Sequence, residues 1–373
     1  MARVRFGDVV KEIKINIDRA TDDHEFYIAG EHMESENIHL TKRGRFEGSD
    51  VGPAFIRLFR PGQVLYGSRR TYLKKVAVAD FEGITSNTTF VLETKDQNVM
   101  MQELLPFIML TDSFTEYTIK NSKGSTNPYI LFSDLCAYEF ELPCIEAQRL
   151  LVERLLACDS AKEAYKRLLA ATDDLVKSQF IEMFYDRDYP LKTIGEVIDK
   201  NILRVAKRFT KDDTIEYLDI SSIDNASKAV TGTTVYTVAD APSRAQYVLR
   251  KNDILYSTVR PNLQNIAVNP YSADNIIGST GFCVLRCKEV TTGFMLGLIT
   301  SEPFTERMVS LASGANYPAV TDKVVHAYEF PMPPIEEQRR FDIIIQQADK
   351  SKFELKQAIE RIDNLIKSLI QQG

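Results

Sequence analysis

The stretch at residues 327–372, AYEFPMPPIEEQRRFDIIIQQADKSKFELKQAIERIDNLIKSLIQQ, determines how the rest of the chain is organised. Within it a seam of mostly apolar residues advances by alternating steps of four and three, the period of a helix that packs lengthwise against another helix. The seam positions are Phe341, Ile345, Ala348, Lys352, Leu355, Ile359, Ile362, Ile366 and Leu369. The stretch therefore predicts one long helix with one buried face.

The same stretch occurs once before. AYEF at 137–140 returns at 327–330, and this shift of 190 residues then holds without a gap, so that ELPCIEAQR (141–149) answers PMPPIEEQR (331–339). The earlier, weaker seam comprises Leu151, Leu155, Cys158, Lys162, Tyr165, Leu169, Thr172, Val176 and Gln179. We expect two long helices, the first running from just after Pro143 to about residue 184 and ending in a turn at 185–190, where Pro190 cannot continue a helix.

The residues before each helix repeat as well. Gln63–Tyr66 returns at Asp253–Tyr256 with the same shift, and Phe114–Glu116 returns at Phe304–Glu306. Strand candidates, rich in β-branched and aromatic residues, lie at 25–28, 64–66, 75–78 and 89–92, and a helical segment interrupted near Pro106 lies at 100–119. The expected fold is α+β: two globular α+β domains in a pseudo-twofold repeat, separated by two long helices that form an antiparallel coiled coil. The expected boundaries are 1–142 and 191–332 for the domains, 143–190 for the first helix with its turn, and 333–373 for the second helix.

A lysine occupies the same position in both seams, Lys162 in the first and Lys352 in the second. The interpretation we favour is that these lysines snorkel at the edge of the seam. The alternative is that they fix the register of the helices, as polar seam residues can.

Composition restricts the class of protein. The chain has 44% apolar and 26% charged residues and a net charge of −6, which argues against indiscriminate coating of nucleic acid but permits local basic patches. No segment has the apolar length of a membrane helix, and residues 1–13 lack a signal-peptide core, so we expect a cytoplasmic protein. Five scattered cysteines suggest neither a disulfide framework nor a zinc site, and no histidine completes a metal site around Cys283 and Cys287.

The most basic stretch is RLFRPGQVLYGSRRTYLKK at 57–75, which contains no acidic residue. A loop follows its predicted strand, and arginines in such a loop can read guanine edges or bind phosphates. The second copy carries asparagine and glutamine at the corresponding place, which suits adenine edges. A solvated charged face is the alternative interpretation.

Two further loop pairs are weaker candidates, for which an ordinary surface turn is an equal alternative: 86–88 with 279–281, and 121–129 with 313–318. The residues predicted to contact DNA are Arg69, Arg70, Thr71, Tyr72, Lys74, Lys75, Ser86, Asn87, Lys123, Ser125, Asn127, Thr258, Arg260, Asn262, Gln264, Asn265, Ser279, Thr280, Asn316 and Tyr317. Another basic group, which we expect to face phosphate, comprises Lys200, Arg204, Lys207, Arg208 and Lys211.

Candidate catalytic motifs are weak. Asn127-Pro128-Tyr129 and Asn269-Pro270-Tyr271 resemble the Asn-Pro-Pro-Tyr element of adenine methyltransferases, but each lacks the second proline and no glycine-rich cofactor loop precedes it. The histidines form no nucleophile–base pattern, and no Gly-Lys-Ser/Thr nucleotide loop occurs. We expect no catalytic residues and no metal site.

The two Pro-x-x-Glu-x-Gln helix entries (Pro143 to Gln148 and Pro333 to Gln338), the long helices after them, the loops after Leu-Tyr and the half-length repeat form a specific set. With them the chain resembles the DNA-specificity subunits of type I restriction–modification systems. The resemblance implies that each domain reads one half of a bipartite DNA site and that the helices set the spacing. It also implies two adenine-methylating modification subunits docked on the helices, and restriction subunits in the full complex. S-adenosylmethionine would then bind to the modification subunit, so that this chain holds no cofactor. The alternatives are a self-contained methyltransferase or nuclease with a specificity module, and a coiled-coil interaction protein that does not bind DNA.

Overall fold

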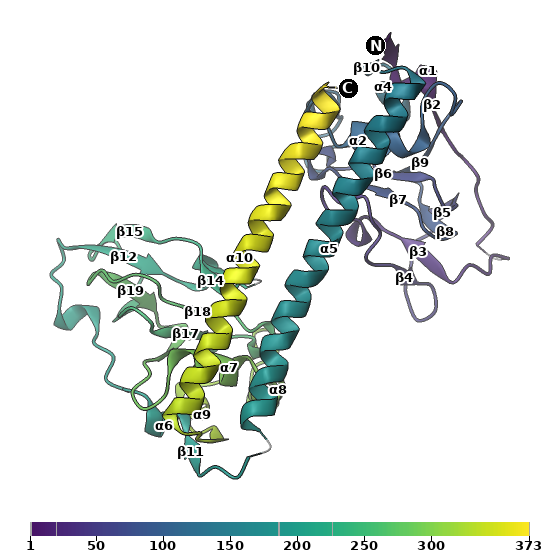
Figure 1. The fold of residues 1–373 in the computed structure, drawn as a ribbon. Coiled ribbons are helices and arrows are strands. Elements are labelled where there is room, and N and C mark those ends of the chain that lie inside the picture. Colours follow the sequence, from purple (N-terminus) through teal and green to yellow (C-terminus); the bar gives the residue numbers. More distant parts are fainter. Residues whose placement is uncertain (1, 20, 186, 226, 373) are drawn as a thin grey trace. The chain divides into compact units, whose positions relative to one another are not determined.

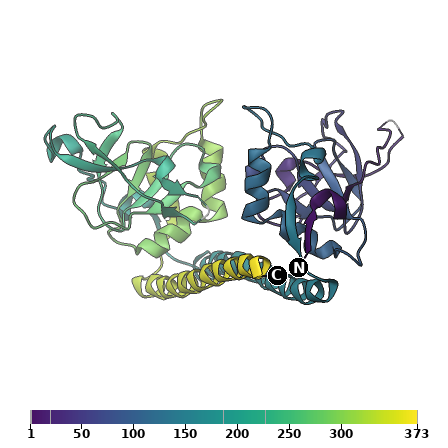
Figure 2. The same ribbon diagram turned by 90° about the horizontal axis from the view of Figure 1, so that it is seen from above.

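The computed structural model describes residues 2–19, 21–185, 187–225 and 227–372. It divides the chain into two compact units: residues 1–166 with 356–373 form the first, and residues 167–355 form the second. In each unit the strands lie to one side of the helix segments (Figures 1 and 2). The predicted α+β class, with two sheet-rich bodies and two long helices, is confirmed. The boundaries predicted at residues 142, 190 and 332 lie near the ends of the long helices and differ from the boundaries of these two units. As domain boundaries they stay a prediction.

Strands of the first unit form two four-stranded sheets, with the orders β2-β9-β6-β7 and β4-β3-β8-β5, and the small pair β1-β10. The elements are β1 (Ala2–Arg5), α1 (Phe6–Val9), β2 (Val10–Glu12), β3 (Phe26–Ile28), η1 (Gly30–His32), β4 (Gly44–Arg45), β5 (Phe55–Phe59), β6 (Val64–Gly67), η2 (Thr71–Leu73), β7 (Val76–Val78), β8 (Gly83–Ser86), β9 (Thr89–Thr94), η3 (Gln102–Leu104), α2 (Leu105–Met109), α3 (Asp112–Lys120), α4 (Phe132–Leu135), β10 (Glu139–Leu142) and the start of α5 (Ile145–Phe184).

The second unit repeats this plan with the sheets β18-β17-β20 and β15-β12-β19-β16 and the pairs β13-β14 and β11-β21. Its elements are β11 (Leu191–Thr193), α6 (Ile194–Val197), η4 (Val205–Lys207), β12 (Thr214–Leu218), η5 (Ile220–Ser222), β13 (Ile223–Asp224), β14 (Ala229–Val230), β15 (Thr234–Thr237), β16 (Ala245–Val248), β17 (Ile254–Ser257), η6 (Pro261–Leu263), β18 (Ile266–Val268), β19 (Ile276–Ser279), β20 (Phe282–Leu285), α7 (Thr292–Thr300), α8 (Glu302–Leu311), α9 (Asp322–His326), β21 (Glu329–Pro331) and α10 (Ile335–Gln372).

The repeat extends to strand pairing. β3 runs parallel to β8, and β12 runs parallel to β19. The next strand in each sheet, β5 or β16, is antiparallel and shifts its register at a matching place, between Phe55 and Arg57 or between Ala245 and Tyr247. Of the strands in these two sheets β3 was predicted, by the candidate at 25–28. The others were not predicted, because they are short and their apolar residues do not alternate clearly.

The glutamine of each Pro-x-x-Glu-x-Gln motif is fully buried. Gln148 accepts a hydrogen bond from the Met101 amide (2.9 Å) and donates to the carbonyls of Val99 and Pro143 (both 2.8 Å). Gln338 likewise accepts from the Thr291 amide (2.9 Å) and donates to the Pro333 carbonyl (2.9 Å). A buried amide whose hydrogen bonds are made stabilises the fold, and one whose bonds are broken destabilises it strongly. The motif therefore fixes the first turn of each long helix to the body of its unit.

The long helices begin and end close to the predicted residues: α5 has 40 residues and α10 has 38. All eighteen seam positions are buried or partly buried. In the first unit Leu155 shares a core with Ile366 and Leu369, whereas Lys162, farther along α5, bonds to the earlier residue Asp363. The helix segments therefore run antiparallel within this unit.

The seam lysines are ion-paired across the helices. The Lys162 Nζ lies 2.5 Å from an oxygen of Asp363, and the Lys352 Nζ lies 3.1 Å from one of Asp173. The 190-residue shift carries one pair onto the other. Each ammonium thus meets a carboxylate of the other helix segment in its own unit, and Lys352 also meets Asp349 of its own helix at 3.0 Å. These pairs are compatible with both interpretations, so the choice between snorkelling and fixing the register stays a prediction.

An aromatic cluster anchors α5 in the second unit. Phe184 is 2% exposed, and its ring centroid lies 5.0 Å from that of Phe294 and 5.6 Å from that of Phe341. We expect Phe184→Ala to destabilise the second unit by about 3–5 kcal/mol, since it removes buried apolar area and leaves a cavity. Leu175→Ala, on the same helix but 56% exposed, should change stability by less than about 0.5 kcal/mol. Peptide-resolved hydrogen exchange of the second unit measures this loss of stability. Equal exchange rates in Phe184→Ala and Leu175→Ala would contradict the prediction.

Candidate nucleic-acid interface

The loop after β6 and the loop after β17 have the same backbone. Each contains a single 3₁₀ turn, η2 or η6, between two residues in the left-handed region. These are Arg70 (φ 51°) and Lys74 (φ 47°) in the first unit, and Arg260 (φ 52°) and Gln264 (φ 48°) in the second. Left-handed non-glycine residues are uncommon and persist where the surroundings enforce them. Their recurrence in both units marks a constrained loop.

Main-chain hydrogen bonds attach a second loop to it. The Arg70 amide donates to the Pro128 carbonyl and the Arg260 amide donates to the Pro318 carbonyl, both at 2.7 Å. Residues 123–129 close on themselves through reciprocal bonds between Lys123 and Tyr129, as residues 313–319 do through Ser313 and Ala319. Equivalent main-chain hydrogen bonds thus join the two loops in each unit.

A third loop is attached to the first loop through the residue that follows β6 or β17. The Ser68 amide donates to the Thr88 carbonyl (3.1 Å), and the Thr258 amide donates to the Gly281 carbonyl (3.3 Å). The structure therefore brings the three predicted loops of each unit together. We call these groups the first loop cluster (67–75, 86–88, 121–129) and the second loop cluster (257–265, 279–281, 313–319).

The predicted contact residues differ in exposure. Those on the surface are Arg69, Arg70, Tyr72, Asn87, Lys123, Ser125, Asn127, Arg260, Asn262, Thr280, Asn316 and Tyr317. Half-buried ones are Lys74, Lys75, Ser86, Thr258, Gln264 and Asn265. Thr71 and Ser279 are each only 3% exposed, and their assignment to the DNA-contacting set is corrected because their side chains face the protein. A role in DNA contact stays a prediction for the exposed set.

Lys74 and Gln264 hold the loops instead of facing outward. The Lys74 Nζ lies 2.8 Å from carboxylate oxygens of both Glu36 and Asp112. Burial alone would lower the pKa of Lys74, but its bonds to these carboxylates raise it, so the ammonium stays charged. Gln264 donates to the Thr305 hydroxyl (2.7 Å) and the Thr300 carbonyl (3.2 Å). Each residue thus ties its loop to the first residues of α3 or α8, through partners that are not equivalent in the repeat. Lys75 is also tied down, since its Nζ bonds to the Gly30 carbonyl.

The outward positions of the two clusters differ in chemistry. The 190-residue shift pairs Arg69 with Val259 and Tyr72 with Asn262. The Arg69 guanidinium makes no hydrogen bond or ion pair within the described ranges of the chain and is free to meet a ligand. Tyr72 is 53% exposed. Each cluster therefore presents different side chains on a common backbone.

Arg70 and Arg260 are shared by both clusters but are oriented by different neighbours. The Arg70 Nε donates to the Asn127 side chain at 3.3 Å. Arg260 donates to the Asn316 carbonyl at 3.2 Å and stacks over the Tyr317 ring, 4.9 Å from its centroid. Such stacking holds a guanidinium plane without neutralising its charge.

Arginine–aromatic stacks on the outer sheets were missed by the sequence reasoning. In the first unit Arg43 lies 4.3 Å from the centre of the Phe26 ring, and Arg19 lies 4.4 Å from that of Phe46. In the second unit Arg204 stacks on Tyr247 at 5.4 Å. Of the predicted basic group at 200–211, Arg208 is neutralised by Asp274 at 2.8 Å. No local pattern signals these stacks, since Arg19 lies 27 residues before Phe46 and Arg43 lies 17 residues after Phe26.

A protein-family model matches the second part of the chain. Residues 187–363 match the family described as the type I restriction modification DNA specificity domain. Over these residues the chain is similar to type I restriction–modification specificity subunits.

Curated members of this family align with the chain to different extents. The type I restriction enzyme MjaVIII specificity subunit of Methanocaldococcus jannaschii is 21% identical over 97% of this chain and 91% of its own length. The HindI specificity subunit of Haemophilus influenzae is 29% identical over 34% of the chain and only 29% of its own length.

Solved structures share the fold over the whole chain. One comes from a study of complex assembly and conformational transition of the type I R-M system; it has a TM-score of 0.59 and 19% identity, and the match covers all of this chain and 96% of that one. The type I S subunit from M. genitalium has a TM-score of 0.53 and 16% identity, with 99% and 95% covered.

The long helices of this specificity-subunit fold carry exposed apolar side chains outside the seam. They are Leu150, Leu156, Leu168, Leu175 and Ile181 on α5, and Ile335, Ile343, Phe353 and Leu365 on α10. The sequence reasoning followed the seam and missed this second set. Apolar side chains in such numbers on an outward face are typical of a protein-binding surface.

No group of three or more histidine, cysteine or carboxylate side chains is placed to hold a metal ion within the described ranges. In that same part of the chain, no helix combines the length and the apolar character needed to cross a bilayer.

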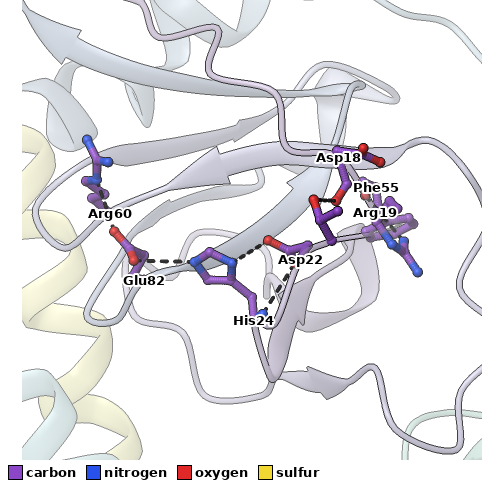
Figure 3. A network of polar contacts seen from close by, with 8 residues as sticks. Asp18, Arg19, Asp22, His24, Phe55, Arg60 and Glu82 are labelled. Atoms are coloured by element: carbon purple, nitrogen blue, oxygen red, sulfur yellow. Dashed lines mark hydrogen bonds and ion pairs between the residues drawn. The ribbon is translucent and has the colours of Figure 1, made fainter.

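A polar network ties Asp22 and His24 to the outer sheet of the first unit (Figure 3). His24 bonds through Nδ1 to Asp22 (2.7 Å) and through Nε2 to Glu82 (3.3 Å), and Glu82 also pairs with Arg60 (3.0 Å). Burial alone would lower the pKa of His24, but the bonds to Asp22 and Glu82 outweigh burial and raise it. The protonated imidazole is therefore the form that stabilises this network.

This shift predicts a pH dependence. A histidine whose pKa rises on folding contributes fully below its unfolded pKa of about 6.5, and that contribution is lost as pH rises through the folded pKa. We expect His24→Gln to lower the unfolding free energy by about 0.2–1 kcal/mol at pH 5.5, the range of exposed ion pairs, and by less at pH 9. His32→Gln is the control of opposite sign, since burial lowers the pKa of His32 and its replacement should cost more at pH 9. Denaturant melts at both pH values test this, and a pH-independent loss for His24→Gln would contradict it.

Proposed function

We propose that this chain reads DNA sequence for a type I restriction–modification complex, and that each loop cluster contacts one half of a bipartite site. The observation that carries this proposal is the pair of loop clusters with the same hydrogen-bonded backbone and different exposed side chains. Recognition of two half-sites with different sequences requires two loop clusters that share a backbone structure and present different exposed side chains.

The exposed side chains suit base edges and phosphates. In the first loop cluster the cations Arg69 and Arg70 can each make paired bonds to guanine O6 and N7 or bind a phosphate. In the second, Asn262 offers the paired donor and acceptor that adenine N7 and N6 accept and donate to. These local groups act in a chain whose net charge is −6, so the attraction to DNA comes from the clusters and not from overall charge.

The partners we propose are two adenine-methylating modification subunits docked on α5 and α10, which also set the distance between the half-sites. The relatives are named as type I restriction enzyme specificity subunits, and the exposed apolar side chains of both helices support docking of another protein. S-adenosylmethionine would bind to the modification subunits and restriction subunits would complete the assembly, in the cytoplasm. This chain itself contributes recognition and no catalytic residue.

DNA binding by the first loop cluster can be tested with a substitution that the fold already tolerates. Arg69→Val installs the residue that the second cluster carries at the equivalent position. If Arg69 contacts a base edge, we expect specific binding to weaken by about 1–3 kcal/mol, and if it contacts a phosphate, a smaller loss with a shallower salt dependence. Binding isotherms with DNA carrying the cognate site, at several salt concentrations, measure both.

Lys11→Ala on β2 removes the same charge from the first unit outside the loop cluster and serves as the control. If the wild type, Arg69→Val and Tyr72→Asn bind the DNA with equal affinity, the first loop cluster does not contact DNA.

Catalysis can be assigned by reconstitution. The purified chain, incubated with cognate DNA and radiolabelled S-adenosylmethionine, should transfer no methyl groups, and addition of the modification subunit should produce adenine methylation. Leu175→Arg, on the outward face of α5, should lower the methylation of the mixture without changing DNA binding by the chain alone. Methyl transfer by the chain without a partner would contradict the proposal.

A further inference from the structure

A pocket of about 900 Å³ lies in the second unit, where residues 198–201, 250–253, 286–288 and 290–292 come together. Its volume is in the range of sites that enclose a small molecule. Five of the fourteen lining residues are cationic and two are acidic, so the lining has an excess of three positive charges in a chain of net charge −6. A cleft lined by one sign of charge concentrates ions of the opposite sign.

The pocket and the second loop cluster lie at opposite ends of the same strand pair, β17 and β20. At one end Ser257 lies opposite Phe282, next to the loop cluster. At the other end Ile254 lies opposite Leu285, and the residues directly before and directly after these two form the pocket. The four residues of β17, roughly 13 Å of strand, separate the two places. The proposed reading of DNA therefore leaves the pocket unexplained.

Arg286 is the buried cation of this pocket, with 9% of its surface exposed. Its Nε and Nη2 donate to Asp253 at 2.9 and 2.7 Å, and Nη2 also donates to the Val248 carbonyl at 3.3 Å. Within the described ranges its Nη1 donates to no other residue, and this nitrogen is accessible to solvent. A guanidinium carries five N–H donors in one plane. This one is held rigidly and keeps the donors of Nη1 for a ligand.

Three exposed cations, Arg250, Lys251 and Lys288, surround the buried one. In the part of the chain that the structure describes, their side chains make no hydrogen bond and no ion pair. The ammonium of Lys200, the fifth cation, lies against Gly195 in α6 instead. The pocket therefore has three cationic side chains that are free to move toward a bound anion.

The carboxylates in and beside the pocket already have partners inside the unit. The pairs are Asp253 with Arg286, Asp199 with the Asn201 amide (2.9 Å), Glu289 with Lys192 (2.8 Å) and Asp342 with the Thr291 hydroxyl (2.9 Å). None of these bonds uses the side chain of an exposed cation of the pocket. Like charges that lie close together repel, so the exposed cations are stabilised when an anion lies between them.

The first unit has the same backbone at the equivalent place. The Arg60 amide donates to the Gln63 side chain at 2.6 Å, as the Arg250 amide donates to that of Asp253 at 2.7 Å. Between them Gly62 and Asn252 are both left-handed, with φ of 84° and 68°. The two places can therefore be compared residue by residue.

The free cations are missing from the first unit. Pro61 stands where the second unit has Lys251, and Arg60 pairs with Glu82 at 3.0 Å. Lys95, the counterpart of Lys288, bonds to a main-chain carbonyl. Glu93 stands in the place of Arg286 and accepts from Gln63 at 2.8 Å. The fold does not need these cations, so they are an addition to the second unit.

We propose that this pocket binds a compact anion, free in solution, that carries two or more linked phosphate groups. The planar fork of Arg286 matches phosphate oxygens in paired bonds. A phosphate group carries about −1.5 to −2 charges at pH 7, so two linked groups match the excess of three positive charges better than a carboxylate does. The site is separate from the loop clusters and does not depend on their reading DNA.

Calorimetric titration of the full-length protein with sodium pyrophosphate tests this site. We expect saturable one-to-one binding that is about tenfold or more tighter than that of inorganic phosphate and that weakens as salt is added, because charge dominates the contact. Citrate carries a similar charge on carboxylates and is the control for charge alone. It should bind about tenfold or more weakly than pyrophosphate, because its charges are spread over a larger ion.

Variants of the protein locate the site. Lys251→Gln with Lys288→Gln should weaken pyrophosphate binding about tenfold or more, since two charges are lost from the pocket. The matched control is Lys323→Gln with Lys350→Gln, which removes two exposed lysines of the same unit outside the pocket and should change nothing. Asp253→Gln with Arg286→Glu installs the buried pair of the first unit and should abolish binding, with thermal melts to show that this variant is folded.

Four outcomes would overturn the proposal. They are the absence of saturable pyrophosphate binding, equal affinity in the wild type and in Lys251→Gln with Lys288→Gln, citrate binding as tight as that of pyrophosphate, and displacement of pyrophosphate by duplex DNA without the cognate site, which would assign the pocket to the DNA backbone. Affinity for cognate DNA, measured in parallel, should be the same in that double variant and the wild type. Failure of this site and failure of the DNA-reading function are therefore told apart.

Discussion

The structure depends on a buried amide at the start of each long helix. Gln148 and Gln338 are inaccessible to solvent, and their hydrogen bonds tie the first helical turn to a main-chain amide some 47 residues earlier. Because a buried amide without its partners is costly, the direction in which each helix leaves its unit is tightly restrained. The helix seam and its ion pairs can form only after this direction is set.

The loop clusters combine a backbone that is fixed by hydrogen bonds with exposed side chains that are free to vary. Many of the bonds that hold the three loops together are made by main-chain atoms and place little demand on residue type, although Ser68 and Thr258 add a hydroxyl bond at the same place. The positions between them, such as Arg69 and Tyr72, are therefore free to change without loss of the frame. A recognition surface built in this way separates the stability of the protein from the identity of what it reads.

Prediction from the sequence was most accurate where the spacing of apolar residues is regular over many turns of helix. The bounds of α5 and α10 were predicted closely, because a heptad seam over some 40 residues, a proline before each helix and Pro190 after α5 leave little freedom. The grouping of the three loops was not predicted, because the repeat pairs each loop with its counterpart and does not place the loops of one unit side by side. Which side chains of these loops are exposed could not be predicted either. Thr71 and Ser279 are polar residues in turns, which are commonly exposed, and only the tertiary packing buries them. The aspartates that pair with Lys162 and Lys352 come from the other helix, about 180–200 residues away, so no local pattern reveals them.

The first unit is not a continuous piece of chain, and this has a consequence for its synthesis. Residues 1–166 leave the ribosome well before residues 356–373, which complete the unit. At about 5–20 residues per second the 189 intervening residues take roughly 10–40 s. During that time Leu151 and Leu155 lack the cover that Ile366 and Leu369 later provide. The nascent chain must keep an apolar helix face from aggregating until its own last helix arrives, which makes the order of translation a physical constraint on this fold.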